Sequence, residues 1–395
     1  WMGAAAGNES LIAEALRISV RYDTLDFLKR LGIDISKLQA FAEKLYPGRI
    51  SGNFKAKFDI SKKMEKTLAM IQFKLEEQTI KKYPQLDMDN RLNLEKLAEL
   101  LKHGQTSGLT DNNFPTLILD DPLRLTDQEK EIIDDLVHQF THSRQIKRLM
   151  EYLFIEGSLY HINNYIMNIH ALVPSTEDGQ FEELYGKKGK ELLDHIEIVV
   201  KDIGKNYLAG KEQEPFQLAT MFYLWCGPKS PLFGKDAMKT FERYFYKDKE
   251  THKEKTLYWG KNIDSMEFIN KLTYEFNVER IVFGHTPVDV SKGQKIASAN
   301  GRAINIDGGF SEAYLNRGHA LIQTPYSLYA IILPASDEII DLRKKKEPTR
   351  LTFEMIDTFD EPKRIKDTYV GKQLVERKNF LLKELKNYKD SSYIE

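Results

Sequence analysis

The sequence predicts a mixed α/β fold in which a helical first third precedes a sheet of short strands. In the first third, apolar residues such as Ile12, Leu16 and Val20 recur at helical spacing. After residue 160, short apolar runs end at glycine, histidine or aspartate, as strands do where they lead into loops. The chain has 395 residues, of which 41% are hydrophobic and 30% charged, and this is enough for two compact units.

Local signals predict the helices. Residues 60–82 place their apolar side chains on one face, which favours a long amphipathic helix. A capping box at residues 126–129 predicts the start of another helix, whose apolar face continues to Phe140. We expect further helices over residues 146–153 and 189–208. The helical region from residue 1 to about 155 is interpreted as scaffold.

Short apolar runs predict the strands. The run at residues 165–169 ends at His170, and the run at residues 281–283 ends in Gly-His-Thr-Pro. Residues 303–307 alternate as a half-buried strand does and end in two glycines. The apolar residues at 319–324 and 328–333 predict further strands of the same sheet stack. The strand ends therefore deliver polar side chains to loops.

The last fifty residues are strongly charged. The run Arg-Lys-Lys-Lys at residues 343–346 is expected to be a solvated loop, and residues 370–385 are expected to form a Lys/Glu-rich helix. Residue 1 is tryptophan, so we expect the sequence to be part of a longer chain.

Composition limits the partners. A formal net charge of -1 supplies no global field for nucleic acid or an anionic membrane, so attraction to a phosphorylated ligand must be local. Cys226 is the single cysteine, which excludes an internal disulfide, and it is expected to be a small buried residue. Because no run has the apolar length of a membrane span and no signal-peptide pattern is present, the expected location is the cytoplasm.

The turn at residues 284–287 is the clearest candidate for chemistry. His285 follows directly on a strand and a glycine, so its ring can be aimed at a metal or an oxyanion. By itself such a histidine can equally bond a backbone carbonyl, and the same alternative holds for His170. His138 and His142 share one helix face but lie at its end, and they are interpreted as solvated, as is His319.

Several strings resemble one enzyme family. Gly-His-Thr-Pro at residues 284–287 and Ile-Asp-Gly-Gly-Phe-Ser-Glu-Ala-Tyr at residues 306–314 resemble the C-terminal half of the calcineurin-like metallophosphatases. The string at residues 230–245 and the Ile-His-Ala-Leu-Val-Pro at residues 169–174 are similar to the class III fructose-1,6-bisphosphatases of Firmicutes and other bacteria. Ala171 and Leu172 stand where that class usually has Gly-Cys.

The resemblance implies an architecture. It is that of a partial calcineurin-like metallophosphatase β-sandwich flanked by helices, with a large N-terminal helical insertion. Residues 1–155 would form the helical cap, residues 156–335 the C-terminal half of the phosphatase core, and residues 336–395 a charged extension with a terminal helix. The family's Asp-x-His, Gly-Asp-x-x-Asp-Arg and Gly-Asn-His-Asp motifs do not occur in this sequence.

The resemblance also implies a site. It identifies His170 and His285 as ligands of one metal in a two-metal manganese centre, which this chain does not complete. Asp307 could orient either histidine, or it could cap a turn at Gly308. No residue of the chain is assigned to acid–base or nucleophilic chemistry.

A bisphosphate substrate also needs cations to hold the phosphate that is not cleaved. Lys235, Arg243 and Arg302 lie in or near the similar strings and are the candidates, although for any one of them a surface charge balanced by a carboxylate such as Asp236 or Glu242 is the favoured interpretation. Tyr314 could contact a sugar.

The implied reaction is metal-dependent hydrolysis of the 1-phosphate of fructose 1,6-bisphosphate in gluconeogenesis, by a homo-oligomer. One alternative is a related phosphatase acting on phosphoproteins or dinucleotides, which the turn at residues 284–287 allows and the string at residues 230–245 does not favour. The other is a non-catalytic remnant that binds a partner or metabolite, since three motifs are missing.

Overall fold

The computed structural model describes residues 1–309, 317–349 and 351–391, and the chain divides into two units. We call residues 1–158 with 194–257 the helical unit, and residues 159–193 with 258–395 the sheet unit. Residues 194–257 therefore group with the N-terminal helices. The predicted division at residues 155 and 335, which follows the family resemblance, stays a prediction.

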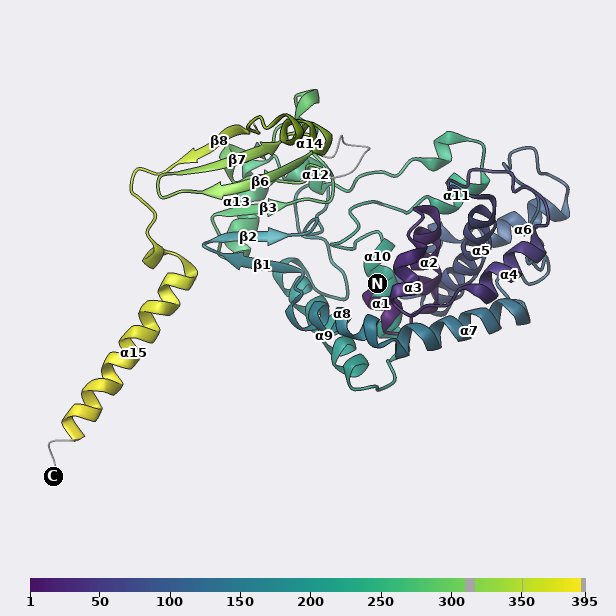
Figure 1. The fold of residues 1–395 in the computed structure, drawn as a ribbon, viewed down its shortest axis with the longest axis horizontal. Helices are drawn as coiled ribbons and strands as arrows, with labels where there is room; N and C mark the ends of the chain where they lie inside the picture. The colour runs from purple at the N-terminus through teal and green to yellow at the C-terminus, as the bar shows by residue number, and fades with distance from the viewer. Residues whose placement is uncertain (310–316, 350, 392–395) are drawn as a thin grey trace. The chain divides into compact units, whose positions relative to one another are not determined.

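The helical unit is built almost entirely of helices (Figure 1). Helix α9 begins in the sheet unit and continues into the helical unit. The longer helices are α2 (Glu9–Arg21), α4 (Ser36–Leu45), α5 (Asp59–Lys82), α6 (Leu94–Lys102), α7 (Asp127–His142), α8 (Arg144–Glu156), α9 (Gly189–Leu208) and α10 (Pro215–Cys226), with the short α1 (Met2–Ala5), α3 (Leu25–Arg30) and α11 (Thr240–Phe245) between them.

The predicted helix signals are confirmed. The Thr126 hydroxyl accepts the Glu129 N–H at 3.2 Å, and the Glu129 carboxylate accepts the Thr126 N–H at 2.8 Å, so the capping box forms and starts α7. At the start of α2, the side chain of Asn8 accepts the backbone N–H of Leu11 at 2.9 Å. These bonds satisfy N–H groups that have no partner within the helix.

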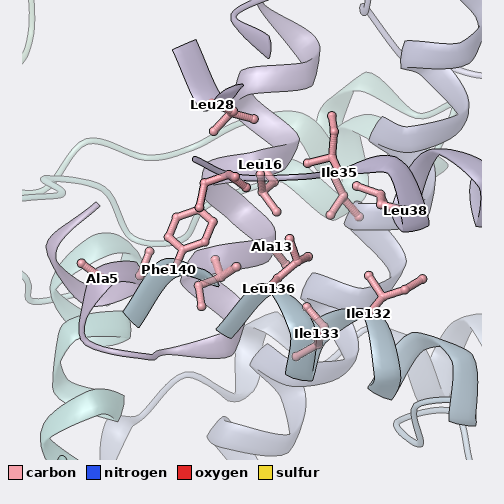
Figure 2. Packing of buried hydrophobic residues seen from close by; sticks show 14 of the residues in the cluster. Ala5, Ala13, Leu16, Leu28, Ile35, Leu38, Ile132, Ile133, Leu136 and Phe140 are labelled. Carbon is pink, nitrogen blue, oxygen red and sulfur yellow. The ribbon is translucent and has the colours of Figure 1, made fainter. Parts of the chain in front are cut away.

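Buried apolar clusters hold the helical unit together, and a large one joins α2, α4 and α7. Leu16 on α2 belongs to the same buried cluster as Ile133, Leu136 and Phe140 on α7 and Leu38 on α4 (Figure 2). All five side chains are buried. Burial of a side chain of this size contributes about 1.5–3 kcal/mol, so α7 is fixed mainly by its apolar face. Cys226 is buried as predicted, and burial raises the pKa of its thiol.

The sheet unit begins with a five-stranded sheet in the order β1-β2-β3-β5-β4. Strands β2, β3 and β5 are parallel, with Met167 opposite Ile281 and Val282 opposite Ile304. Helix α13 (Met266–Phe276) precedes β3, and α12 (Trp259–Asn262) lies before it. The strands are β1 (Tyr160–Asn163), β2 (Ile166–Ile169), β3 (Arg280–Phe283), β4 (Ala297–Ser298) and β5 (Ala303–Asn305).

A second, antiparallel sheet has the order β6-β7-β8, formed by Gly318–Gln323, Ser327–Leu333 and Thr352–Thr358 (Figure 1). Val282 and Ile304 of the first sheet share a buried cluster with Leu328 and Ala330 of β7. The two sheets thus pack face to face, and the predicted mixed α/β fold is confirmed.

The C-terminal region differs in part from the prediction. Residues 343–345 are not a loop but the last turn of α14 (Ser336–Lys345), where basic side chains interact favourably with the helix carbonyls. The helix ends at Lys346, whose φ of 57° is left-handed. The terminal helix α15 (Tyr369–Ser391) is confirmed and is longer than expected. Among the described residues, no helix has both the length and the apolar character that crossing a membrane requires.

A buried carboxylate on α5 gives the helical unit a pH dependence. Glu77 Oε1 accepts the N–H groups of Asn93 and Leu94 at 2.8 and 2.9 Å, and burial raises the pKa of this carboxyl to about 7. The folded protein therefore holds this proton over a range in which the unfolded chain, with a pKa near 4.5, has lost it. The contribution of Glu77 to stability is greatest below pH 4.5 and falls as the pH rises to 7.

The Glu77→Gln variant keeps the oxygen that accepts both bonds and removes the titration. We expect it to gain stability relative to the wild type as the pH rises from about 5 to about 8, because the wild type alone must bury a charge. Urea unfolding at the two pH values measures this difference. Glu151→Gln on exposed α8 is the control, and an identical pH profile for the Glu77 variant and the wild type would contradict the assignment.

Candidate metal centre

Three parallel strands carry the candidate residues to one edge of the first sheet. His170 follows β2, His285 lies two residues beyond β3, and Asp307 lies two residues beyond β5. Because the three strands run in the same direction, their carboxyl ends open at the same edge. The parallel register therefore places residues that are far apart in the sequence next to one another.

The two histidine rings meet at this edge. His170 Nε2 lies 3.1 Å from His285 Nδ1, and the ring centroids are 5.0 Å apart. The Gly284 N–H donates to the His170 carbonyl oxygen at 3.1 Å, so the two turns are joined through the backbone as well. The pair is a feature of the folded backbone and not only of two flexible side chains.

The backbone at His285 is in an uncommon conformation. Its φ is +71°, in the left-handed region that costs a non-glycine residue about 1–2 kcal/mol. The surrounding turn is tied down, since Asn305 Nδ2 donates to the Thr286 carbonyl at 2.9 Å and the Val288 N–H donates to the Asp307 carbonyl at 2.8 Å. Strain of this kind persists only where neighbouring contacts fix it, and it is enriched at functional sites.

The His170 ring is suited to bind a cation in its neutral form. Partial burial lowers the pKa of His170, the nearby His285 lowers it further, and the charge of Asp307 acts in the opposite direction. A metal binds unprotonated imidazole, so a lowered pKa favours binding near neutral pH. His170 remains exposed to solvent, and a ligand can reach it.

Asp307 has contacts that bear on both roles considered for it, which are orienting a histidine and capping the turn at Gly308. Its Oδ1 accepts the Gly309 N–H at 2.8 Å, which caps the turn, while its charge acts on His170. A Cβ added at Gly284 would lie 3.4 Å from Asp307 Cβ, at ordinary van der Waals distance, so the two turns are neighbours. The turn cap fixes the carboxylate at the histidine edge.

His319 was interpreted as solvated, and that interpretation is wrong. It lies on β6 with 9% of its surface exposed, and its Nδ1 has no hydrogen-bond partner among the described residues. Burial lowers its pKa, and Asp307 is the largest opposing influence. Gly308 explains the proximity, since a Cβ there would lie 2.7 Å from Gly318 Cα. The sequence of β6 gives no sign that His319 lies near Asp307, because this proximity arises from the packing of β6 against the turn at Gly308.

The predicted phosphate-binding cations form contacts of their own. Arg302 lies before β5, at the opposite end of that strand from Asp307, and it donates to Asn270 Oδ1 and Thr273 Oγ1 of α13. Lys235 and Arg243 belong to the helical unit. Lys235 donates to Thr256 Oγ1 at 3.1 Å. Tyr314 lies outside the described residues.

The histidine pair fits one metal but does not complete a centre. Two nitrogens bound at about 2.1 Å to the same ion at right angles are about 3 Å apart, which matches the 3.1 Å observed. Within the described parts of the chain, no group of three or more histidine, cysteine or acidic side chains is arranged to hold an ion. The structure therefore brings together two candidate ligand nitrogens, those of His170 and His285.

Comparison with known proteins identifies the family of the chain. Residues 1–390 match the family described as Firmicute fructose-1,6-bisphosphatase. The chain belongs to this family. The match extends past residue 314, where the resemblance read from the sequence ended. No solved structure matches the chain.

Among its relatives are proteins named fructose-1,6-bisphosphatase class 3. Those from Clostridium acetobutylicum, Fusobacterium nucleatum and Bacteroides thetaiotaomicron are 34%, 35% and 33% identical over 95%, 98% and 98% of this chain. The matches cover 60%, 63% and 63% of those proteins. The chain thus spans about three fifths of the length of these members of the Firmicute fructose-1,6-bisphosphatase family.

A single methyl group should loosen the turn at Gly308. In Gly308→Ala, the new Cβ would lie 2.7 Å from Gly318 Cα and 2.9 Å from the Arg317 carbonyl oxygen, both backbone atoms that cannot turn away. We expect a loss of about 1–3 kcal/mol in the free energy of unfolding, measured by denaturant titration. Gly48→Ala is the control, because its Cβ meets nothing within 4 Å. Equal stability of the two variants would show that β6 does not pack on this turn.

Proposed function

We propose that the protein containing this chain is a metal-dependent phosphatase that converts fructose 1,6-bisphosphate to fructose 6-phosphate and phosphate, a reaction of gluconeogenesis. The observation that carries the proposal is the pair His170 and His285, with ring nitrogens 3.1 Å apart at the carboxyl edge of parallel strands, in a chain of this family. The names of the relatives supply the substrate.

The proposed cofactor is a pair of manganese ions, one of them held by His170 and His285. When bound, such ions would activate water and stabilise the charge that develops on the transferring phosphate. The two histidines hold the ion in their neutral form, and Asp307 limits the loss of imidazole basicity that burial causes. Carboxylate ligands for the second ion must come from residues other than His170 and His285.

Two further expectations are part of the proposal. Assembly into a homo-oligomer is supported by α15, where Val370, Leu374, Leu381, Leu385 and Tyr388 form an exposed apolar stripe with 50–74% of each residue accessible. Location in the cytoplasm is consistent with the absence of a membrane-spanning helix among the described residues.

Loss of either histidine should lower metal affinity. In the longest open reading frame that contains this chain, we expect His170→Ala and His285→Ala to weaken manganese binding by more than the 10–100-fold typical of an outer-shell partner. Bound manganese is measured by equilibrium dialysis, with folding checked by circular dichroism. His142→Ala is the matched control, since His138 and His142 also stack closely, at 4.2 Å, on an exposed helix face. Unchanged stoichiometry in the site variants would reject the ligand assignment.

Substrate identity is tested separately with the same protein. We expect manganese-dependent release of phosphate from fructose 1,6-bisphosphate, loss of the activity with a chelator, and recovery when manganese is returned, because the ions supply the charge stabilisation. Turnover of phosphopeptides or dinucleotides without turnover of the sugar would favour the related phosphatases. Manganese binding with no hydrolysis of any of the three would favour a binding protein.

A further inference from the structure

The helical unit contains a large open cleft with a volume of about 790 Å³. One wall is α2, and the others are residues 52–55, Trp225 at the end of α10, and side chains between residues 233 and 254. This volume is in the range of small-molecule sites in proteins. We call it the arginine cleft, after Arg17, Arg21 and Arg243, which all line it.

Two of these arginines lie on the α2 wall, and Arg17 is held there by three hydrogen bonds. Arg17 is 3% exposed and donates to Glu14 Oε1 at 2.5 Å, to Gln72 Oε1 at 2.8 Å and to the Tyr244 hydroxyl at 2.5 Å. Arg21 lies one turn later on α2 and reaches the same hydroxyl at 3.4 Å. Arginines held in this way lose little further freedom when they bind an anion.

The third arginine reaches the cleft from α11. Arg243 pairs with Glu254 Oε1 at 3.0 Å and donates to the His252 carbonyl at 3.3 Å, while 49% of its side chain stays exposed. Asn53 Nδ2 donates to the Arg243 carbonyl at 3.0 Å, which ties the loop at residues 52–55 to this helix. Arg243 is therefore positioned by its contacts, yet it remains accessible to a ligand.

Cations outnumber carboxylates in the lining. Glu14 and Glu254 face five cationic side chains, which are Arg17, Arg21, Lys55, Arg243 and Lys249. Lys55 and Lys249 are exposed, and neither forms an ion pair or a side-chain hydrogen bond with another described residue. In a chain with a formal net charge of -1, this is the kind of local positive field that a phosphorylated ligand requires.

Aromatic surface completes the lining. Trp225 is 42% exposed and Tyr22 is 68% exposed, and both belong to the cleft. Exposed aromatic rings offer flat faces to a sugar or a base, while cations hold its phosphate. We propose that the arginine cleft binds a small organic phosphate, with the phosphate held by Arg243, Lys55 and Lys249 and its ring against Trp225.

The ligand chemistry has two sources, the sugar bisphosphate or another phosphorylated metabolite, and only the first rests on the proposed function. Calorimetric titrations of the chain with a chelator present use fructose 1,6-bisphosphate, uridine 5′-monophosphate and inorganic phosphate, so that binding is measured without metal or hydrolysis. If the protein proves not to be a phosphatase, the binding titration can still be interpreted. If the cleft binds no phosphate, the hydrolysis assay can still be interpreted.

The decisive comparison uses paired lysine variants. We expect Lys55→Gln with Lys249→Gln to weaken binding of at least one organic phosphate about tenfold or more, and Trp225→Phe to remove the quenching of tryptophan fluorescence that accompanies binding. Lys44→Gln with Lys96→Gln removes two exposed lysines outside the cleft and should leave affinity unchanged. If the cleft variant loses affinity for fructose 1,6-bisphosphate alone, the ligand of the cleft is the sugar bisphosphate. If it loses affinity for uridine 5′-monophosphate alone, the ligand is another phosphorylated metabolite.

Three results would overturn the inference. They are the absence of binding for both organic phosphates, equal binding by the cleft variant and the wild type, and an equal loss in the control variant. The Arg243→Lys variant keeps the positive charge but removes the guanidinium group that can donate two parallel hydrogen bonds to a phosphate. It therefore separates a structural role of Arg243 from a role in binding. We expect its thermal unfolding to match the wild type and its affinity for the bound phosphate to fall.

Discussion

The parallel pairing of β2, β3 and β5 is the constraint on which the candidate metal centre depends. His170 and His285 are 115 positions apart in the sequence, yet the pairing brings their rings within hydrogen-bond distance. A slip of one residue in either strand would turn its side chains to the opposite face and move its histidine. The bond from the Gly284 N–H to the His170 carbonyl continues the ladder past the strand ends and fixes this register where the chemistry is expected.

Features carried by local sequence were predictable. The capping box of Thr126 and Glu129, the extent of α5 and the boundaries of α9 follow from helix periodicity and end signals, which act over one or two turns, whereas the burial of charged residues such as Lys74 on α5 does not. The two histidines were identifiable because each comes shortly after an apolar strand. The resemblance to the family then implied that both bind the same metal. The sequence did not indicate that their rings would lie 3.1 Å apart.

Features that depend on distant contacts were not predictable. Arg302 follows a turn and precedes a strand, but only the strand direction shows that it lies at the end opposite to Asp307. His319 was assigned to solvent because no sequence pattern shows that Gly308 and Gly318 let two backbones touch. Strand β8 was missed because residues such as Phe353 and Met355 are exposed, so its pattern does not mark a buried face.

The string at residues 230–245 has a physical meaning in the helical unit. Tyr244 accepts bonds from Arg17 and donates to Glu65 Oε1 at 2.7 Å, and the Met238 carbonyl accepts a bond from Arg91 at 2.8 Å. Burying so many charges costs desolvation energy that apolar residues would avoid, so the network is weak evidence for stability and better evidence for fixed geometry. Its product is a pair of arginines held on one wall of a cleft, which an apolar core could not provide.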